Sequence, residues 1–252
     1  MFQINNLINN DNIKVIDSKE NIKVIEYEKD LSVVPETAIV SYFSSKMNVR
    51  KRQVVVELNN ESVILSAGAM QWMAGDIKIS SDIKGVGDFV GKMFKAAATN
   101  ESIAKPKYSG TGTLVLEPTY KFILLEDVSD WDGGIVLDDG LFLACGSTVS
   151  QKIVSRANLS SAVLGNEGLF NLSLTGKGIA VLESEVPREE LIEVVLNNDV
   201  LKIDGNNAIA WSGTLDFTVE KSTRSLIGSA VSGEGFLNVY RGTGKVLMAP
   251  TI

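Results

Sequence analysis

Histidine is absent from this chain of 252 residues, and cysteine occurs only once, at Cys145. Imidazole is the commonest metal ligand and the usual neutral-pH base, so its absence excludes Ser-His-Asp and Cys-His nucleophilic sites. A single cysteine cannot form an internal disulfide, and without histidine it cannot build the usual structural zinc sites. We therefore predict a cytoplasmic protein with no metal, no cofactor and no catalytic residues of these classes.

Positive charge is also scarce, because 24 Lys and Arg residues face 31 Asp and Glu residues, for a net charge of −7. The average field of such a chain repels phosphate backbones and anionic lipid surfaces. We therefore do not expect nucleic acid as a partner unless a local basic patch exists. No apolar run approaches the roughly 18 residues of a spanning helix, and residues 1–14 lack the pattern of a signal peptide. We predict an unexported protein without a transmembrane segment, and peripheral membrane association stays open.

An internal repeat is the strongest positive feature, carried by the segments SGTGTLVLEP, TGKGIAVLES and RGTGKVLMAP. Equivalent residues recur every 66 positions: Gly110, Gly176 and Gly242; Gly112, Gly178 and Gly244; Leu116, Leu182 and Met248. Glycine tolerates positive φ and close backbone approach, so a Gly-x-Gly pair entering an apolar strand indicates a bulge or tight strand crossing. We predict that these six glycines are structural, because no helix follows them as in a phosphate-binding loop.

Between these blocks the sequence is typical of short strands. Residues 76–80 and 215–220 alternate apolar and polar side chains, and Asp-Gly or Asn-Asp pairs separate the apolar runs. One stretch differs, because residues 85–99 place apolar side chains at helical spacing. Residues 159–164 and 224–231 are weaker equivalents. The chain is therefore predicted to be all-β with short connecting helices.

The repeat divides the chain into an N-terminal extension, residues 1–51, and three modules at about 52–117, 118–183 and 184–252. A module of this size cannot close a good core alone, so we expect the three to pack on one another. The extension contains a charged hairpin at residues 12–30 and four basic residues between Lys46 and Arg52. A solvated sheet edge explains the basic residues, and a docking patch for an acidic partner is the alternative.

The candidate site is an apolar cluster on a predicted strand and the neighbouring predicted helix: Met70, Gln71, Trp72, Met73, Phe89, Met93 and Phe94. Methionine and aromatic side chains routinely fill gaps between modules, so core packing is the first interpretation. The alternative is a pocket for a small apolar ligand, or a face that binds an unknown protein or a second copy, with Gln71 as the polar contact.

Two further features have a simple interpretation. The acidic segment Glu126–Asp139 superficially suggests a calcium loop, but the loop register that fits best places Val128 at the first ligand position. A solvated turn is therefore favoured, and cation binding is left open. Cys145 lies in a predicted strand with no basic neighbour in sequence, which indicates a small buried hydrophobic residue.

Four blocks carry a family resemblance: AGAMQWMAGDIKIS from Ala67, GKMF, GNEGLFNLSLTGKGIAVL and SGEGFLNVYRGTGKVLMAP. In that order, over roughly residues 54–250, they resemble the family named for altered inheritance of mitochondria in yeast, which has many bacterial members. Its tryptophan-RNA-binding-attenuator-like (TRAP-like) domain implies three double-stranded β-helix or sandwich modules around a pseudo-threefold axis. The resemblance implies no catalytic residues, although yeast relatives are tied to mitochondrial membrane organisation.

Three functions follow as hypotheses. The leading one is a non-catalytic β-scaffold that binds a protein or small ligand or organises a membrane-associated complex, with homo-oligomerisation expected. The second is a carboxylate-dependent hydrolase, which would need two carboxyl groups in one concave pocket. The third is RNA binding by analogy with the attenuator fold, which would need a basic groove, since fold alone does not imply function.

Overall fold

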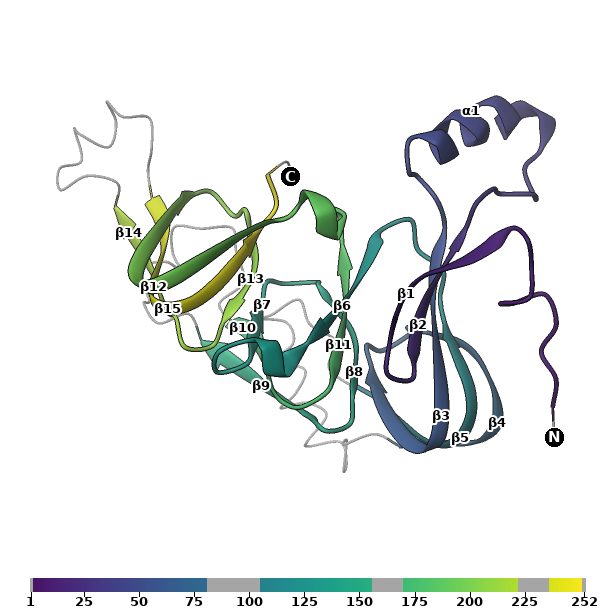
Figure 1. The fold of residues 1–252 in the computed structure, drawn as a ribbon, viewed down its shortest axis with the longest axis horizontal. Helices are drawn as coiled ribbons and strands as arrows, with labels where there is room; N and C mark the ends of the chain where they lie inside the picture. The colour runs from purple at the N-terminus through teal and green to yellow at the C-terminus, as the bar shows by residue number, and fades with distance from the viewer. Residues whose placement is uncertain (1, 81–104, 156–169, 222–235, 251–252) are drawn as a thin grey trace, which may run out of the picture.

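The fold is all-β, with one α-helix in the part of the chain that the structure describes (Figure 1). The computed structural model describes residues 2–80, 105–155, 170–221 and 236–250. Its strands form two curled sheets of eight and seven strands. The helices predicted at residues 85–99, 159–164 and 224–231 lie outside the described residues. Within those residues no helix is both long and apolar enough to cross a bilayer.

The first sheet begins with the charged N-terminal segment, which forms an antiparallel pair of strands and continues the sheet through β3. Its main path is β1 (Ile13–Lys19), β2 (Ile22–Tyr27), β3 (Arg52–Leu65), β8 (Phe142–Gly146), β11 (Ile179–Ser184) and β6 (Phe122–Asp127). β5 (Lys107–Leu116) also pairs with β3, and β4 (Met70–Ser80) pairs with β5. The N-terminal extension is therefore part of the sheet rather than an appendage.

The second sheet is built by the C-terminal half of the chain. Its main path is β12 (Ile192–Asp204), β15 (Phe236–Met248), β13 (Ala208–Ser212), β7 (Ile135–Leu137), β10 (Phe170–Gly176) and β9 (Val149–Ser155). β14 (Asp216–Lys221) pairs with β15. Two 3₁₀ turns, η1 (Val128–Asp130) and η2 (Arg188–Glu190), connect strands of the two sheets.

The middle third of the chain joins the two sheets. β6, β8 and β11 belong to the first sheet, whereas β7, β9 and β10 belong to the second. One buried cluster contains Leu182 of β11, Leu137 of β7 and Leu247 of β15, so its packing spans the junction. Figure 1 shows β6, β8 and β11 between the N-terminal and C-terminal groups of strands. The sheets therefore share a core.

Two of the three repeated glycine pairs lie where long strands bulge, whereas Gly176 and Gly178 lie at the bend between β10 and β11. Gly110 in β5 has φ 142°, and a Cβ built there would stand 2.0 Å from the carbonyl oxygen of Asp76 in β4. Opposite, β3 bulges at Asn60, which has φ 56° and whose N–H donates to Thr111 Oγ1 at 3.0 Å. The pairing of β12 with β15 repeats this bulge at Asn198, whose N–H donates to a threonine between two glycines. These glycines permit close strand crossings.

The structure also contains a helix that the sequence analysis did not predict. α1 (Pro35–Lys46) connects β2 to β3 and stands clear of the sheets in Figure 1. Pro35 occupies the first turn, where its missing N–H costs nothing, and Glu36 and Lys46 lie at the ends favoured by the helix dipole. No residue of α1 is buried. The helix is therefore held in place by its ends and by the polar contacts beneath it.

Candidate functional site

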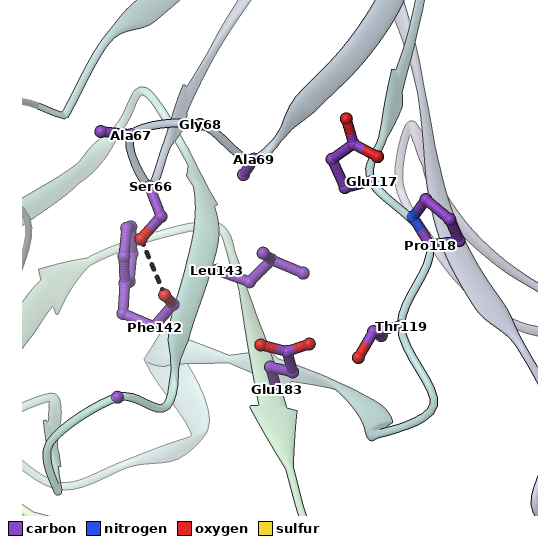
Figure 2. A pocket seen from close by; sticks show the side chains of 11 residues that line it. Ser66, Ala67, Gly68, Ala69, Glu117, Pro118, Thr119, Phe142, Leu143 and Glu183 are labelled. Carbon is purple, nitrogen blue, oxygen red and sulfur yellow. Dashed lines mark hydrogen bonds between the residues drawn. The ribbon is translucent and has the colours of Figure 1, made fainter.

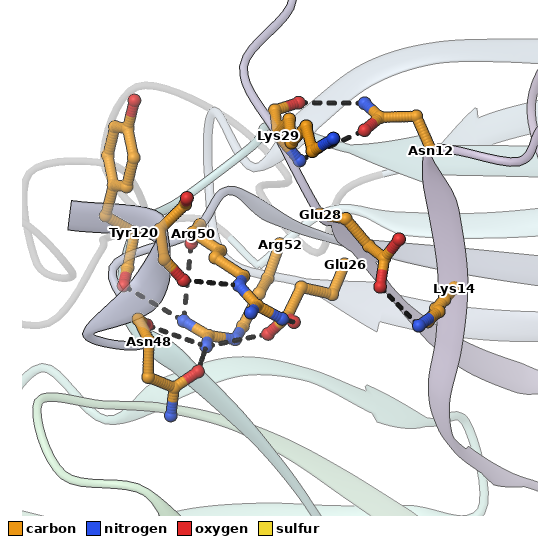
Figure 3. Close-up of polar contacts among 10 residues, drawn as sticks. Asn12, Lys14, Glu26, Glu28, Lys29, Asn48, Arg50, Arg52 and Tyr120 are labelled. Carbon is orange, nitrogen blue, oxygen red and sulfur yellow. Dashed lines mark hydrogen bonds and ion pairs between the residues drawn. The ribbon is translucent and has the colours of Figure 1, made fainter. Parts of the chain in front are cut away.

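A buried ion-pair network lies at the base of α1 (Figure 3). Arg52, at the start of β3, is only 2% exposed and pairs with Glu26 of β2 at 2.7 Å. Arg50 pairs with the other oxygen of Glu26, also at 2.7 Å. Arg52 donates further hydrogen bonds to Asn48 Oδ1 and to the carbonyl oxygen of Tyr120. A buried charge needs such partners, because removal from water is costly unless each donor is satisfied.

This network changes the interpretation of the basic segment at residues 46–52. Arg50 and Arg52 are engaged by Glu26, and Lys51 pairs with Asp30 at 2.7 Å. The Lys46 ammonium lies 5.3 Å from the ring centroid of Tyr42. Three of the four basic side chains therefore pair with carboxylates of the same chain, and two of them share Glu26. The segment fixes the C-terminal end of α1 to the first sheet.

A cavity of about 600 Å³ lies between α1, the N-terminal segment and the first sheet. The inward side of α1 contributes Ser41, Ser44 and Ser45, and β4 contributes Gln71. The remaining polar side chains of its wall are mostly amides and hydroxyls: Asn6, Asn10, Asn12, Tyr27, Ser32, Gln53 and Tyr120. Its size is within the range of small-molecule sites.

Four of the five charged side chains of the cavity wall are paired, and Lys29 is the one without an ion pair among the described residues. Asp30 binds Lys51, Arg50 binds Glu26, and Glu28 binds Lys14, as Figure 3 shows for the last two pairs. The hydrogen bond from Lys51 holds the pKa of the Asp30 carboxyl below its usual range, and the same contact raises the pKa of Lys51. Both groups stay ionised near neutral pH and engage each other. Most charges of the wall therefore cancel within pairs, and Lys29 adds one positive charge.

Amide groups form the floor of the cavity. Gln53 Nε2 donates to Gln71 Oε1 and to the carbonyl oxygen of Leu116, both at 2.9 Å, and its Oε1 accepts a hydrogen bond from the Tyr27 hydroxyl. Burial raises the pKa of Tyr27, partly opposed by the nearby Lys51 charge. The phenol therefore stays protonated and remains a donor at neutral pH. Gln71 accepts through Oε1, and within the described residues its Nε2 group donates to no other group.

Comparison with known proteins adds a family to this geometry. The family model described as mitochondrial biogenesis AIM24 matches residues 44–251, which is most of the chain. The chain belongs to the AIM24 family. The match begins inside α1 and includes β3 through β15, so it contains both sheets but not the β1–β2 hairpin. The resemblance stated from the sequence blocks is thus confirmed.

An X-ray crystal structure of a Streptococcus pyogenes protein is similar in fold to this AIM24 chain, with a TM-score of 0.58. The two are 24% identical, and the similarity covers 81% of this chain and 90% of the other. At that identity the likeness concerns the fold alone. No curated protein matches the chain.

The apolar cluster predicted as the site of this AIM24 chain divides between two sides of β4. A register shift separates Met70, which pairs with Leu116, from Trp72, which pairs with Val115. Met70 packs on the cluster that contains Leu114 and Leu116, whereas Trp72 packs on the one that contains Val115. Met73 is 37% exposed. The bulge therefore places Met70 and Trp72 in different cores, and Phe89, Met93 and Phe94 lie outside the described residues.

A second pocket has two glutamates at different parts of its wall (Figure 2). Glu117, directly after β5, and Glu183, in β11, both line a hollow of about 400 Å³. Its wall includes the Ser66–Ala69 turn, where Ser66 Oγ donates to the carbonyl oxygen of Phe142 at 2.9 Å. The two glutamates are 66 residues apart and occupy equivalent positions of the repeat, whereas the third position is Ala249. Both glutamates follow the repeated leucine in sequence, which is the signal that could have identified them.

The acidic segment Glu126–Asp139 is engaged in structural contacts. Glu126 is buried and pairs with Arg188 at 3.2 Å, and it accepts a hydrogen bond from Trp131 Nε1. Asp127 accepts hydrogen bonds from Ser129 Oγ and from Ser129 N, which caps η1, and these bonds lower the pKa of its carboxyl. Across residues 2–80, 105–155, 170–221 and 236–250, no group of three or more acidic or cysteine side chains is arranged to hold a metal ion.

Cys145 is completely buried in β8. Burial raises the pKa of its thiol to about 12, although a hydrogen bond from Gln151 acts in the opposite direction. The thiolate is the reactive form of cysteine. Cys145 therefore packs as an apolar side chain and its protonated thiol is unreactive at neutral pH.

Proposed function

We propose that this AIM24 chain is a non-catalytic, cytoplasmic β-scaffold that binds a small, uncharged polar ligand in the cavity beneath α1. The observation that carries the proposal is the composition of the cavity wall, where amides and hydroxyls from five separate segments converge. Specific ligand sites combine a shaped concave wall with a few convergent polar groups. The sequence suggested an apolar ligand near Gln71, and the polar wall around Gln71 revises that expectation.

The pairing of charges supports an uncharged ligand over an ion. Glu28, Asp30, Arg50 and Lys51 have their partners within the chain, so an ionic ligand that binds one of these four groups would have to displace an existing ion pair. A neutral ligand rich in hydroxyl or amide groups needs no such exchange, because asparagine and glutamine side chains offer both donors and acceptors. N-acetylglucosamine has this chemistry and is a suitable probe.

The scaffold role is supported by a pattern of strand pairing that occurs three times in the chain. The same register shift occurs at three places. Met70 and Trp72 pair with Leu116 and Val115, Phe142 and Ala144 pair with Leu182 and Val181, and Ala208 and Ala210 pair with Met248 and Leu247. The same backbone hydrogen bond follows each: Glu117 N to Ala69 O, Glu183 N to Leu141 O, Ala249 N to Asn207 O. We infer three related TRAP-like modules around a pseudo-threefold axis, and three modules favour a structural role over a single asymmetric catalytic cleft.

The ligand proposal is tested by filling the cavity. Ser44→Trp places a large side chain on the inward face of α1, and Ser18→Trp, at an exposed position near the end of β1, is the matched control. Binding of N-acetylglucosamine is followed by native mass spectrometry and calorimetry, alongside the charged analogues glucosamine and glucuronate. We expect saturable binding by the wild type and by Ser18→Trp, loss of at least about tenfold in affinity for Ser44→Trp, and weaker binding of both analogues.

The proposal fails if neither this probe nor any molecule retained from the expression host binds the wild type. It also fails if Ser44→Trp binds the probe as well as Ser18→Trp does. Preference for glucuronate or glucosamine would contradict the assignment of an uncharged ligand.

A second candidate function, hydrolysis by a carboxylate pair, is favoured by the presence of Glu117 and Glu183 in one hollow. Glycosidases use two carboxyl groups, one as acid and one as base or nucleophile.

The hydrolase candidate is tested by measuring turnover of 4-nitrophenyl glycosides by the wild type, Glu117→Gln, Glu183→Gln and the exposed control Glu185→Gln. Loss of about 10²-fold or more in both pocket variants alone would support catalysis, because general acid–base groups contribute at least that much. An inactive wild type would exclude this candidate.

A further inference from the structure

Helix α1 has the reverse of the usual amphipathic arrangement. Its partly covered side, which faces the cavity and the sheet, carries Ser41, Ser44 and Ser45. Its opposite side carries four exposed apolar residues: Ile39 (72% exposed), Tyr42 (54%), Phe43 (62%) and Met47 (78%). A surface helix normally turns its apolar stripe toward the core. An outward stripe of this kind marks an interaction surface.

The helix is held so that this stripe stays outward. Arg50 Nε donates to the carbonyl oxygen of Ser45 at 2.9 Å, and Val49 N donates to the carbonyl oxygen of Ser44 at 3.0 Å. Arg50 in turn pairs with buried Glu26. The orientation of the C-terminal end of α1 is therefore set by the first sheet through a buried anchor. A rotation that would bury Ile39 and Phe43 against the body would break these contacts.

We propose that the outward face of α1 binds the same face of a second copy of this chain, with the two helices antiparallel about a twofold axis. Glu36 in the first turn and Lys46 in the last turn share this face with Ile39 and Phe43. They are ten residues apart, or about 15 Å along the helix. Antiparallel pairing therefore brings Glu36 of each copy next to Lys46 of the other, at both ends of the apolar contact.

Charge favours a second copy over a lipid surface. A helix that lies on an anionic bilayer has a basic rim, whereas this face carries one acidic and one basic side chain at opposite ends. The basic residues that follow the helix are paired with Glu26 and Asp30, and the chain has a net charge of −7. By contrast, a face with opposite charges at its two ends is self-complementary under twofold symmetry. Among the described residues, neither Glu36 nor Lys46 forms an ion pair within the chain.

Exposed apolar residues extend the patch beyond the helix. Val34 precedes α1 and is 53% exposed. Leu31 and Val49, which are 72% and 49% exposed, lie beside the patch and also line the cavity. A single helix with these flanks still offers less area than a standard stable interface, which buries about 800 Å² per partner. The dimer should therefore dissociate on dilution. Because Ile39 and Phe43 do not line the cavity, self-association through them and ligand binding can each fail without the other.

Sedimentation velocity of the full chain from about 1 µM to about 200 µM tests the proposal, since a weak dimer dissociates in this range. We expect the weight-average mass of the wild type to rise toward twice the monomer. Ile39→Ser with Phe43→Ser should abolish the rise, whereas Val195→Ser, which removes an equally exposed apolar side chain from β12, should leave it unchanged. Thermal unfolding of each variant establishes that the fold is retained.

A charge exchange tests the antiparallel geometry. Glu36→Lys and Lys46→Glu should each weaken self-association, because each places like charges together at both ends of the contact. An equal mixture of the two variants should form heterodimers, since every facing pair is then opposite in sign. A strictly monomeric wild type, a dimer insensitive to Ile39→Ser with Phe43→Ser, or a mixture that fails to associate would overturn the proposal. Binding to phosphatidylglycerol vesicles by a chain that never self-associates would also overturn it.

Discussion

At the scale of single residues, the most consequential side chain is Arg52. Its guanidinium group is buried where β3 begins, between Glu26, Asn48 and the ring of Phe122, whose centroid lies 4.2 Å away. One arginine therefore joins β2, the loop after α1 and the start of β6. In the sequence the same residue is only the last member of a basic run. Its role arises because the fold supplies a carboxylate at that depth.

Removal of one partner of this buried pair should be strongly destabilising. Arg52→Met leaves Glu26 with only Arg50, and we expect a loss of about 3 kcal/mol in the free energy of unfolding. Lys23→Met removes a solvent-exposed pair with Glu57 and should cost under about 1 kcal/mol. Urea unfolding of both variants provides the comparison. Equal losses would indicate that the Arg52 network does not stabilise the fold.

Cys145 leads to a prediction about pH. The folded thiol has a pKa of about 12 against an ordinary value of 9.0, so both states hold the proton below pH 9. Above pH 9 the unfolded chain loses this proton and the folded chain keeps it, so the folded state becomes less stable as pH rises toward 12. Cys145→Ala should reduce this decline, measured as the free energy of unfolding from pH 8 to 10.5.

The same thiol should react with Ellman's reagent at pH 8 only as fast as the chain unfolds, since the buried protonated form is inert. Full reactivity in urea is the control. Rapid reaction of the native protein would contradict the burial of Cys145.

At the scale of elements, the long strands β5 and β15 depend on glycine pairs opposite a bulge. Each pair flanks a threonine whose hydroxyl accepts the N–H of an asparagine with positive φ, Asn60 or Asn198. The glycines let the neighbouring strand approach, and the threonine satisfies the N–H that the bulge leaves unpaired. In β5 and β15 the repeated motif is thus one local device that curls a sheet, whereas the Gly176–Gly178 copy lies at a bend between strands.

Gly110→Ala tests this device. A Cβ at Gly110 would stand 2.0 Å from the backbone oxygen of Asp76 at a φ of 142°, so we expect a loss of at least about 2 kcal/mol in stability. At Gly146 in β8 the nearest atom would be 3.8 Å away and φ is not in the left-handed region. Gly146→Ala should therefore change stability by less than about 1 kcal/mol. The melting temperatures of the two variants give the comparison, and similar values would refute the close-crossing role.

At the scale of the whole molecule, the division into sheets does not follow the division into repeats. The middle repeat contributes β6, β8 and β11 to one sheet and β7, β9 and β10 to the other. Its hydrophobic side chains join those of β13 and β15 in one cluster. Neither sheet can therefore lose the middle third without losing strands and core together.

Unfolding should accordingly be a single transition. Trp72 lies in the first sheet and Trp211 in the second. One variant keeps only Trp72 and the other keeps only Trp211, with the remaining tryptophans changed to Phe. The fluorescence of each variant then follows the unfolding of one sheet. We expect the two fluorescence transitions in urea to coincide once each is compared with circular dichroism of the same variant. Two separated midpoints would mean that the sheets unfold independently.

Particular residues show how far prediction from sequence extended. The strands at residues 76–80 and 215–220 were found by alternation, whereas α1 was missed although Pro35 and the spacing of Ile39, Phe43 and Met47 are helical signals. The apolar cluster at residues 70–73 was identified, but one bulge sends Met70 and Trp72 to opposite sides. A register shift of one residue depends on the partner strand, so sequence alone could not reveal it. Glu117 and Glu183 were likewise visible as repeat positions but not as neighbours.

The sequence by itself determined the all-β class, the 66-residue recurrence, the glycine positions and the family, because each depends on local residue order and composition. Only the tertiary structure decided that Arg52 is buried against Glu26, that α1 turns its apolar stripe to solvent, and that amides from distant segments surround one cavity. These facts depend on contacts between residues far apart in the chain. Such contacts are set by how strands pair and pack, and no local pattern encodes them.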